Sequence, residues 1–453
     1  MTADRPRQAA LEVLRAVRED DAYANLVAPQ VIHGFGLTGR DAGLATELAY
    51  GTLRWRGLYD AILTPLVTRS WDRVEPALQD VLRLGAHQLL AMRVPDHAAV
   101  DSSCDLARAA GAPPGAAARA GFVNAVLRKV AARDVEGWAT QLQGGRADDD
   151  LGWLSTRWSH PTWITRALRD ALGPRRDELV DLLAADNAPV RPTLVARPGR
   201  IDVEELLALP ETEPGRWSPL AAALAEGTPA ALSCVRDGRV GVQDEGSQLV
   251  ALAVARAAVD GGDTAWLDVC SGPGGKAALL DGWARERGGQ LVAVEQHEHR
   301  ARLVREALGP HSTADVLVGD ARERPWGDQR FDRVLVDAPC TGLGALRRRP
   351  ESRWRRTPAD LASLGPLQRE LLSAALDAVR PGGVVGYATC SPHVAETELV
   401  VSDALRGRDD IEVVDVPALL PEVPDAAVGP YLQLWPHRHG TDAMFCAVLR
   451  RRA

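Results

Sequence analysis

The sequence predicts a multi-domain chain: an N-terminal all-α bundle, a small α+β connecting unit and a C-terminal α/β domain with a parallel, doubly wound sheet. Three observations predict it. The chain has 453 residues, more than one average domain. Apolar residues recur at helical spacing through the first third of the chain. After Asp244, short apolar runs alternate with helical stretches, which is typical of strands joined by helices.

The bundle is expected to span residues 1–140. Leu78, Val81, Leu82 and Leu89 follow the spacing of one buried helix face, and similar stripes occur elsewhere in this region. The following stretch QLQGGRADDD contains the Gly and Asp residues of a linker, so we place the first boundary there.

The connecting unit is expected to span residues 151–240. Its signals are mixed: helical patterns cover 153–172 and 177–185, and a short strand-like run, TLVARPG, follows them. A small α+β subdomain fits this combination.

The third domain, 241–453, contains the predicted strands AWLDVC, QLVAVE, DVLVGD, RVLVDA and GVVGYATC, and we expect MFCAVLRR to add an antiparallel edge strand to the same sheet. Ligands of such sheets bind at the carboxyl ends of the strands. Acidic and sulfur-containing residues stand at those ends: Asp268, Cys270, Glu295, Asp320, Asp337, Cys340 and Cys390.

A Gly-rich loop, LDVCSGPGGKAALL, joins the first of these strands to a helix. Glycine lets a ligand approach the backbone, and a helix N-terminus favours a carboxylate or a phosphate. The loop has neither the GxGxxG pattern nor the Walker spacing, so NAD and ATP fit poorly. A tight turn alone would explain the glycines, but Glu295 and Asp320 at successive strand ends favour a nucleoside ligand. An adenosine that carries an amino-acid carboxylate, as in S-adenosylmethionine, suits this loop.

The six cysteines contain no CxxC pair, which indicates reduced thiols. Cys340 and Cys390 differ from the other three outside the loop, which we expect in the core, because both follow a strand and precede turn residues. A thiolate beside a methyl donor suits methylation of pyrimidine C5: addition to C6 makes C5 nucleophilic. Asp337 is placed to assist at the ring N3. The pattern alone does not choose between the two thiols.

Several motifs together resemble the Sun/Nol1/Nop2 family of RNA cytosine-C5 methyltransferases: CSGPGGK, GDAR, DAPCTGLGALRRRPESRW, YATCS and HGTDAMFCAVLRR. The N-terminal motifs YGTLRW, LRLGAHQLL, RVPDHAAV and GFVNAVLRK resemble the NusB-like RNA-binding domain of the bacterial small-subunit rRNA members. The resemblance runs from about residue 5 to 450. It implies a NusB-like bundle, a Rossmann-like methyltransferase domain, S-adenosylmethionine as the cofactor and RNA, most specifically small-subunit (16S) rRNA, as the substrate.

The resemblance also implies residue roles. Cys390, in the TCS motif, matches the family's nucleophile, and Cys340, in DAPC, matches the cysteine thought to assist release of the methylated RNA. In DNA cytosine methyltransferases the Pro-Cys cysteine attacks instead, so only the TCS motif decides. The matched cofactor-binding positions are Cys270, Ser271, Gly272, Pro273, Gly274, Gly275, Lys276, Glu295, Arg300, Asp320 and Asp337.

The chain departs modestly from the family pattern. The loop reads CSGPGGK where CAAPGGK is common, Glu295 replaces a usual Asp, and Thr341 replaces Ser. Small residues and the negative charge are kept, so we expect the chemistry to be unchanged.

A net charge of −8 argues against a uniformly cationic RNA-binding surface, so RNA contacts must rest on a local patch. The stretch LRRRPESRWRR combines arginines with a tryptophan beside Cys340, as phosphate contact and base stacking require, although a solvated charged face is the plainer explanation. The predicted RNA-binding residues are Arg347, Arg348, Arg349, Arg353, Arg355 and Arg356. In the bundle, Arg54, Arg56, Arg83 and Arg128 are candidates for a second contact.

Neither an apolar signal core nor a run of ~20 apolar residues occurs, so we expect a cytoplasmic protein without membrane contact. We also expect the protein to be a monomer. His160 and His437 have no partners at metal-ligand spacing, so no metal is predicted.

Two other functions remain open at this point. A non-catalytic RNA-binding assembly or antitermination factor could carry a relic sheet, but it need not keep Cys390 and the glycines. A methyltransferase for exocyclic amines would need a polar-Pro-Pro-aromatic clamp, which DAPC and TCS do not provide.

Overall fold

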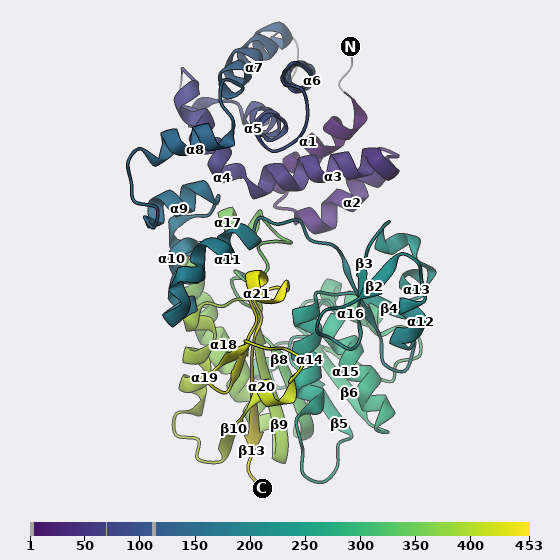
Figure 1. Ribbon diagram of the computed structural model, residues 1–453. Helices are drawn as coiled ribbons and strands as arrows, with labels where there is room; N and C mark the ends of the chain where they lie inside the picture. The colour runs from purple at the N-terminus through teal and green to yellow at the C-terminus, as the bar shows by residue number, and fades with distance from the viewer. Residues whose placement is uncertain (1–3, 69, 111–114) are drawn as a thin grey trace. The chain divides into compact units, whose positions relative to one another are not determined.

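The computed structural model describes residues 4–68, 70–110 and 115–453 (Figure 1). The chain forms two compact units. The first comprises residues up to 169 together with 177–188 and 346–355, and the second comprises 170–176, 189–345 and 356–453. Within the described residues, no helix is long and apolar enough to cross a membrane.

The first unit is helical, as predicted. Helix α1 begins after Asp4, whose carboxylate accepts the N–H of Arg7, and Pro6 occupies its first turn, where no N–H is needed. The core includes the fully buried side chains of Ile62, Leu82 and Val123. The larger helices of the bundle are α1 (Arg5–Glu19), α2 (Ala24–Gly34), α3 (Gly39–Arg54), α4 (Arg56–Leu63), α5 (Pro76–Leu90), α6 (Asp96–Ala109), α7 (Ala116–Val130) and α8 (Val135–Gln143).

The residues of the predicted connecting unit are divided between the two compact units. Helices α9 (Leu151–Arg157) and α11 (Leu179–Ala185) cluster with the bundle, and the strands that follow them belong to the second unit. The reason is local packing. The Oγ atom of Ser159 accepts the N–H of Gly57 in α4 at 2.8 Å, and the rings of Trp55 and Trp158 lie 6.2 Å apart. These contacts attach the helical half to the bundle.

The second unit begins with a small antiparallel sheet of order β2-β3-β1-β4. Its own core contains Leu194, Ala222 and Val240, together with Leu206 of a short flanking helix, α12 (Val203–Leu207). The strands are β1 (Thr193–Ala196), β2 (Thr212–Pro214), β3 (Ala221–Leu224) and β4 (Val240–Val242).

The large sheet has the order β11-β12-β13-β9-β8-β5-β6-β7, and β10 (Ile411–Val414) pairs with β13. Five neighbouring strands are parallel: β5 (Ala265–Asp268), β6 (Gln290–Glu295), β7 (Asp315–Val318), β8 (Phe331–Asp337) and β9 (Val379–Thr389). The last strand, β13 (Phe445–Arg451), runs antiparallel to β9, as predicted. It is not the predicted edge strand, because β10, β12 (Tyr431–Gln433) and β11 (Ala427–Val428) continue the sheet beyond it. The chain order reverses at β5, and ligands of doubly wound sheets bind at such a point.

Helices cover both faces of this sheet (Figure 1). Alternate residues of β8 point to opposite faces: Leu335 packs in the cluster with α14, whereas Val334 and Val336 pack in the cluster with α18. The covering helices are α14 (Glu245–Arg256), α15 (Gly275–Glu286), α16 (Glu298–Leu308), α18 (Pro358–Ala378) and α19 (Glu398–Leu405).

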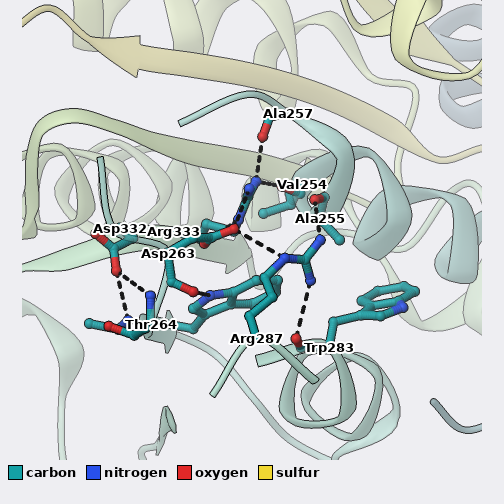
Figure 2. A network of polar contacts seen from close by, with 12 residues as sticks. Val254, Ala255, Ala257, Asp263, Thr264, Trp283, Arg287, Asp332 and Arg333 are labelled. Carbon is teal, nitrogen blue, oxygen red and sulfur yellow. Dashed lines mark hydrogen bonds and ion pairs between the residues drawn. The ribbon is translucent and has the colours of Figure 1, made fainter. Parts of the chain in front are cut away.

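An ionic network links the amino end of β8 to the residues just before β5 (Figure 2). The guanidinium of Arg333 pairs with both carboxylate oxygens of Asp263 at 2.8 Å and donates to the carbonyl oxygens of Val254 and Ala257 at 2.6 Å. Because these carbonyls end α14, the network satisfies acceptors that the helix leaves without partners. The opposite, carboxyl ends of the strands remain available for chemistry.

Candidate active site

The carboxyl ends of the parallel strands carry the residues predicted from the sequence. Asp268 ends β5, Glu295 ends β6 and Asp337 ends β8, while Cys390 directly follows β9. Asp337 pairs in register with Ala388, two residues before Cys390. The structure therefore brings the predicted acids and the second thiol to one edge of the sheet.

The Gly-rich loop is held tightly on β6. Both the N–H and the Oγ atom of Ser271 donate to the carbonyl oxygen of Val294 at 2.9 Å. At Gly272, a Cβ atom would lie 2.1 Å from the Glu295 carboxylate, and at Gly274 it would lie 2.6 Å from Ala307 of α16. Gly274 also has a φ of +110° and precedes the first residue of α15. Glycine is required here because the neighbouring elements leave no room for a side chain.

The three acids of the site differ in their surroundings. Burial raises the pKa of Asp268 to about 7, and the charge of Asp337 adds to the rise. One oxygen of Asp268 accepts the N–H of Cys270 at 3.3 Å, and within the described residues the other has no hydrogen-bond partner. Glu295 is also buried and accepts the N–H of His297 at 3.1 Å. Asp268 was not among the predicted cofactor residues, although its position at a strand end is the signal that would identify it.

Two further predicted cofactor residues contact the loop or lie near it. The guanidinium of Arg300 donates to the carbonyl oxygen of Gly272 at 2.8 Å and lies 3.6 Å from the Glu295 carboxylate. Asp320 is bound by Arg322, and this hydrogen bond lowers the pKa of the Asp320 carboxyl. Arg300 thus supports the loop directly, while Asp320 already has a cationic partner.

The sulfur atoms of Cys340 and Cys390 lie 3.4 Å apart, and both thiols are free. Backbone hydrogen bonds hold their two turns together. The N–H of Ala338 donates to Ala388, and the N–H of Gly344 donates to Cys390, both at 2.9 Å. One thiol can therefore donate its hydrogen to the other.

Charges around the pair distinguish the two sulfurs. The hydrogen bond from Cys340, together with the Lys276 ammonium, lowers the pKa of Cys390, against the effects of burial, Asp337 and Asp442. The same hydrogen bond and burial raise the pKa of Cys340 well above its ordinary value. The thiolate therefore forms first at Cys390.

Lys276 connects the Gly-rich loop to the end of β8. Its Nζ atom donates to a carboxylate oxygen of Asp337 at 2.8 Å. Burial alone would lower the pKa of Lys276, but the charge and hydrogen bond of Asp337 raise it above its ordinary value. Lys276 is therefore a fixed cation that orients Asp337 and acts on Cys390.

The arginine-rich segment belongs largely to the first unit, where 346–355 is packed against the bundle. Arg353 is fully buried and donates to the carbonyl oxygens of Arg54, Ser159 and Asp186 and to the side chain of Asn187, at 2.7–3.2 Å. This geometry assigns Arg353 to the packing of the unit, because both terminal nitrogens of its guanidinium donate within the unit and its side chain has no solvent-facing surface.

Other arginines of the prediction are also engaged. Arg355 donates to the carbonyl oxygens of Val17 and Ala22, and Arg349 lies over the ring of Tyr23. Arg356 belongs to the second unit and lies 3.7 Å from Asp360. A run of arginines in the sequence does not reveal that distant carbonyl oxygens and rings will take up their guanidinium groups.

The bundle arginines proposed for a second RNA contact are divided in the same way. Arg83 is buried and pairs with Asp60 and Asp80, and Arg54 is buried as well. Arg128 is exposed and Arg56 is partly exposed. Of these four arginines, Arg128 and Arg56 therefore keep exposed surface.

His160, one of the two histidines for which no metal is predicted, contacts other groups of the protein. His160 is buried, and burial lowers its pKa to about 4, while its Nδ1 atom contacts the carbonyl oxygen of Trp158 at 2.7 Å. Across residues 4–68, 70–110 and 115–453, no three His, Cys, Asp or Glu side chains lie together as a metal site.

The chain is similar to known proteins over most of its length. Residues 257–450 match the family model of the 16S rRNA methyltransferase RsmB/F, and residues 4–132 match the NusB family. A protein of Mycobacterium tuberculosis whose name states a methyltransferase but no substrate is 51% identical over 449 residues, which cover 99% of this chain and 97% of that protein. The ribosomal RNA small subunit methyltransferase B of Vibrio cholerae is 32% identical over 422 residues, with 91% and 90% of the two chains covered.

Two solved structures have a similar fold. The crystal structure of PH0851 aligns with a TM-score of 0.80 at 22% identity and covers 99% of this chain and 98% of its own. The crystal structure of NSun6 from Pyrococcus horikoshii with SFG aligns with a TM-score of 0.54 at 18% identity, covering 65% and 98%. At these identities the similarity establishes the fold alone.

Proposed function

Because the chain belongs to the RsmB/F family of 16S rRNA methyltransferases and carries a NusB-family domain, we propose that it transfers a methyl group from S-adenosylmethionine to C5 of a cytosine in small-subunit rRNA. The observation that supports this most directly is the pair of free thiols, 3.4 Å apart, beside the Gly-rich loop. A methyltransferase that acts on a nitrogen or an oxygen has no use for such a pair.

The residues around the loop fit S-adenosylmethionine. Asp268 has a buried carboxylate oxygen without a partner among the described residues, which suits a ligand's ammonium or hydroxyl group. Glu295, at the end of β6, has the position from which an acid binds ribose hydroxyls. At Gly272 the Glu295 carboxylate occupies the space that a Cβ would fill, so glycine lets the loop lie directly against this acid. When bound, S-adenosylmethionine supplies an electrophilic methyl group.

Cys390 starts the reaction on the base. Its thiolate forms a bond to C6, and the electrons of the C5–C6 double bond move to C5, which becomes nucleophilic. Asp337, oriented by Lys276, acts at N3 and limits the charge that develops on the ring.

Release reverses the addition. After methylation, a base takes the proton from C5, the electrons of that C–H bond restore the C5–C6 double bond, and the bond from C6 to Cys390 breaks, which returns the sulfur as a thiolate. The thiol of Cys340 then donates to the departing Cys390 thiolate, which restores the 3.4 Å contact seen here.

We assign recognition of rRNA to the NusB-family domain together with the partly exposed arginines of the segment 347–356, and not with its buried members Arg347 and Arg353. The target cytosine has to leave any base stack before a thiol reaches C6. Phosphate contacts by arginines would hold the surrounding strand. Two binding modules in one chain also raise the effective concentration of RNA at the second.

The test uses the full chain with S-adenosylmethionine and unmodified small-subunit rRNA. Wild type, Cys390→Ala and Cys340→Ala are compared by mapping 5-methylcytosine and by isolating protein-RNA adducts. We expect no methylation with Cys390→Ala and a stalled adduct with Cys340→Ala. The reverse pattern would exchange the roles of the thiols, and a wild type that methylates no form of rRNA would favour a non-catalytic assembly factor.

A further inference from the structure

A buried carboxylate, that of Glu396, lies beside the turn that contains Cys340. Glu396 is 1% exposed and ends the short helix η6 (Val394–Glu396), six residues after Cys390. Within the described part of the chain, no Lys, Arg or His forms an ion pair with it. Burial of an unpaired charge is costly unless hydrogen bonds compensate for it, so such a residue calls for an explanation.

The hydrogen bonds of Glu396 converge on the turn that contains Cys340. One carboxylate oxygen accepts the N–H of Thr341 at 2.8 Å and an amide hydrogen of Gln368 at 3.2 Å, and the other accepts the hydroxyl of Thr341. All these partners donate, which is the pattern of an ionised carboxylate. The charge therefore lies next to Cys340, which directly precedes Thr341.

The same bonds extend to the turn that contains Cys390. The hydroxyls of Thr341 and Ser391 lie 3.2 Å apart. The amide of Gln368 also donates to Pro339 at 2.8 Å, and the hydroxyl of Tyr387 donates to the backbone of Glu396 at 2.8 Å. Glu396 thus connects the residues on both sides of Cys340 to the residue after Cys390.

The charged groups around the two sulfurs are different. Cys340 is affected by Cys390, by burial and by the negative charge of Glu396, all of which raise its pKa. The groups acting on Cys390 are Cys340, the Lys276 ammonium, and the carboxylates of Asp337 and Asp442. His393 and Tyr387 are the remaining titratable groups near Glu396. Cys390 thus has a cation beside two carboxylates, whereas the ionised side chain that acts on Cys340 is Glu396.

We propose that Glu396 is a positioning residue that holds the Cys340 turn against the Cys390 turn and, through its charge, keeps Cys340 as the thiol while Cys390 carries the thiolate. Its use in catalysis rests on the proposed function. Its effect on the thiols does not, because that effect is a property of the protein without RNA.

The decisive variant is Glu396→Gln, which keeps the size and an acceptor oxygen but removes the charge. The matched control is Glu398→Gln, which makes the same change at an exposed position two residues away. The full-length reduced protein is treated with iodoacetamide over a series of pH values, and the initial rate at each cysteine is measured by peptide mass spectrometry. We expect the midpoint for Cys340 to fall by about one pH unit in Glu396→Gln, since a neighbouring charge shifts a pKa by about that much, and to stay in place in Glu398→Gln.

A second variant separates charge from packing. Thr341→Val removes the hydroxyl that bridges Glu396 and Ser391 but leaves the charge, so we expect the Cys340 midpoint to stay in place. An unchanged midpoint in Glu396→Gln would overturn the proposal, and so would an equal shift in Thr341→Val. Thermal unfolding of each variant shows whether it is folded before its thiols are compared.

In the methylation assay, we expect Glu396→Gln to bind S-adenosylmethionine as wild type does and to accumulate the covalent RNA adduct, because an amide cannot accept all three hydrogen bonds that hold the Cys340 turn in place. Normal release with no adduct would contradict a function in catalysis. If wild type methylates no RNA, the proposed function fails, whereas the alkylation result still decides whether Glu396 controls the thiols.

Discussion

Replacement of Arg353 tests whether this arginine of the arginine-rich segment stabilises the first unit or binds RNA. Replacement by Met keeps an unbranched apolar stem but leaves four buried acceptors without their donor: the carbonyl oxygens of Arg54, Ser159 and Asp186, and the amide oxygen of Asn187. At about 1 kcal/mol for each unsatisfied group, the unfolding free energy of the first unit should fall by about 4 kcal/mol. For a unit of about 150–250 residues, this corresponds to a Tm lower by about 8–16 °C.

The assay pairs thermal unfolding with RNA binding over a series of salt concentrations. Arg356→Met is the control, because Arg356 has only a 3.7 Å ion pair on a partly exposed surface, a pair worth about 1 kcal/mol or less. We expect it to leave the Tm unchanged and to reduce the salt dependence of RNA binding by about one ion. An Arg353→Met protein with an unchanged Tm and weakened RNA binding would refute the structural role.

Three further outcomes are expected in the second unit. Lys276→Met should move the alkylation midpoint of Cys390 to higher pH, because the lysine charge lowers the pKa of that thiol; an unmoved midpoint would contradict this. The raised pKa of Asp268 stabilises the folded wild type only at low pH, so the wild type should lose up to about 4 kcal/mol of unfolding free energy as the pH rises from 3.8 to about 7. Asp268→Asn lacks this carboxyl group and should therefore gain the same amount relative to wild type over that range. Chemical denaturation of both proteins at several pH values measures the difference. Gly272→Ala should weaken S-adenosylmethionine binding at least about tenfold, as measured by calorimetry. Its Cβ would lie 2.1 Å from the Glu295 carboxylate and displace the loop. An unchanged affinity would show that the loop can adjust.

The sequence alone determined the fold classes and the placement of the chemistry. Helical spacing in the bundle and alternating strand and helix patterns after Asp244 are local properties, and the structure confirms both the helical first part and the doubly wound sheet. Since parallel strands end at one edge, the positions of Asp337 and Cys390 followed from the same pattern. The Gly-rich loop was identified because glycines at a strand-to-helix turn have a backbone reason to be there.

Other features depended on contacts between residues far apart in the sequence. The segment 346–355 follows strand β8 in sequence, yet it packs in the unit formed by the first helices. No local pattern predicts that the guanidinium of Arg353 donates to acceptors 166 to 299 residues away in the sequence. The helices of the region 151–188 joined the bundle for a similar reason, through contacts such as that of Ser159 with Gly57.

The order of the two thiols likewise required the tertiary structure. Both cysteines occupy equivalent places in the sequence, each after a strand and before a turn, so the pattern alone could not rank them. Their pKa values diverge first because the sulfurs are close enough to share a hydrogen, and further because Lys276 acts on Cys390 while Glu396 acts on Cys340. Residue types and the ends of strands can be predicted from the amino-acid sequence, but burial and the distances between charges arise only when the chain folds.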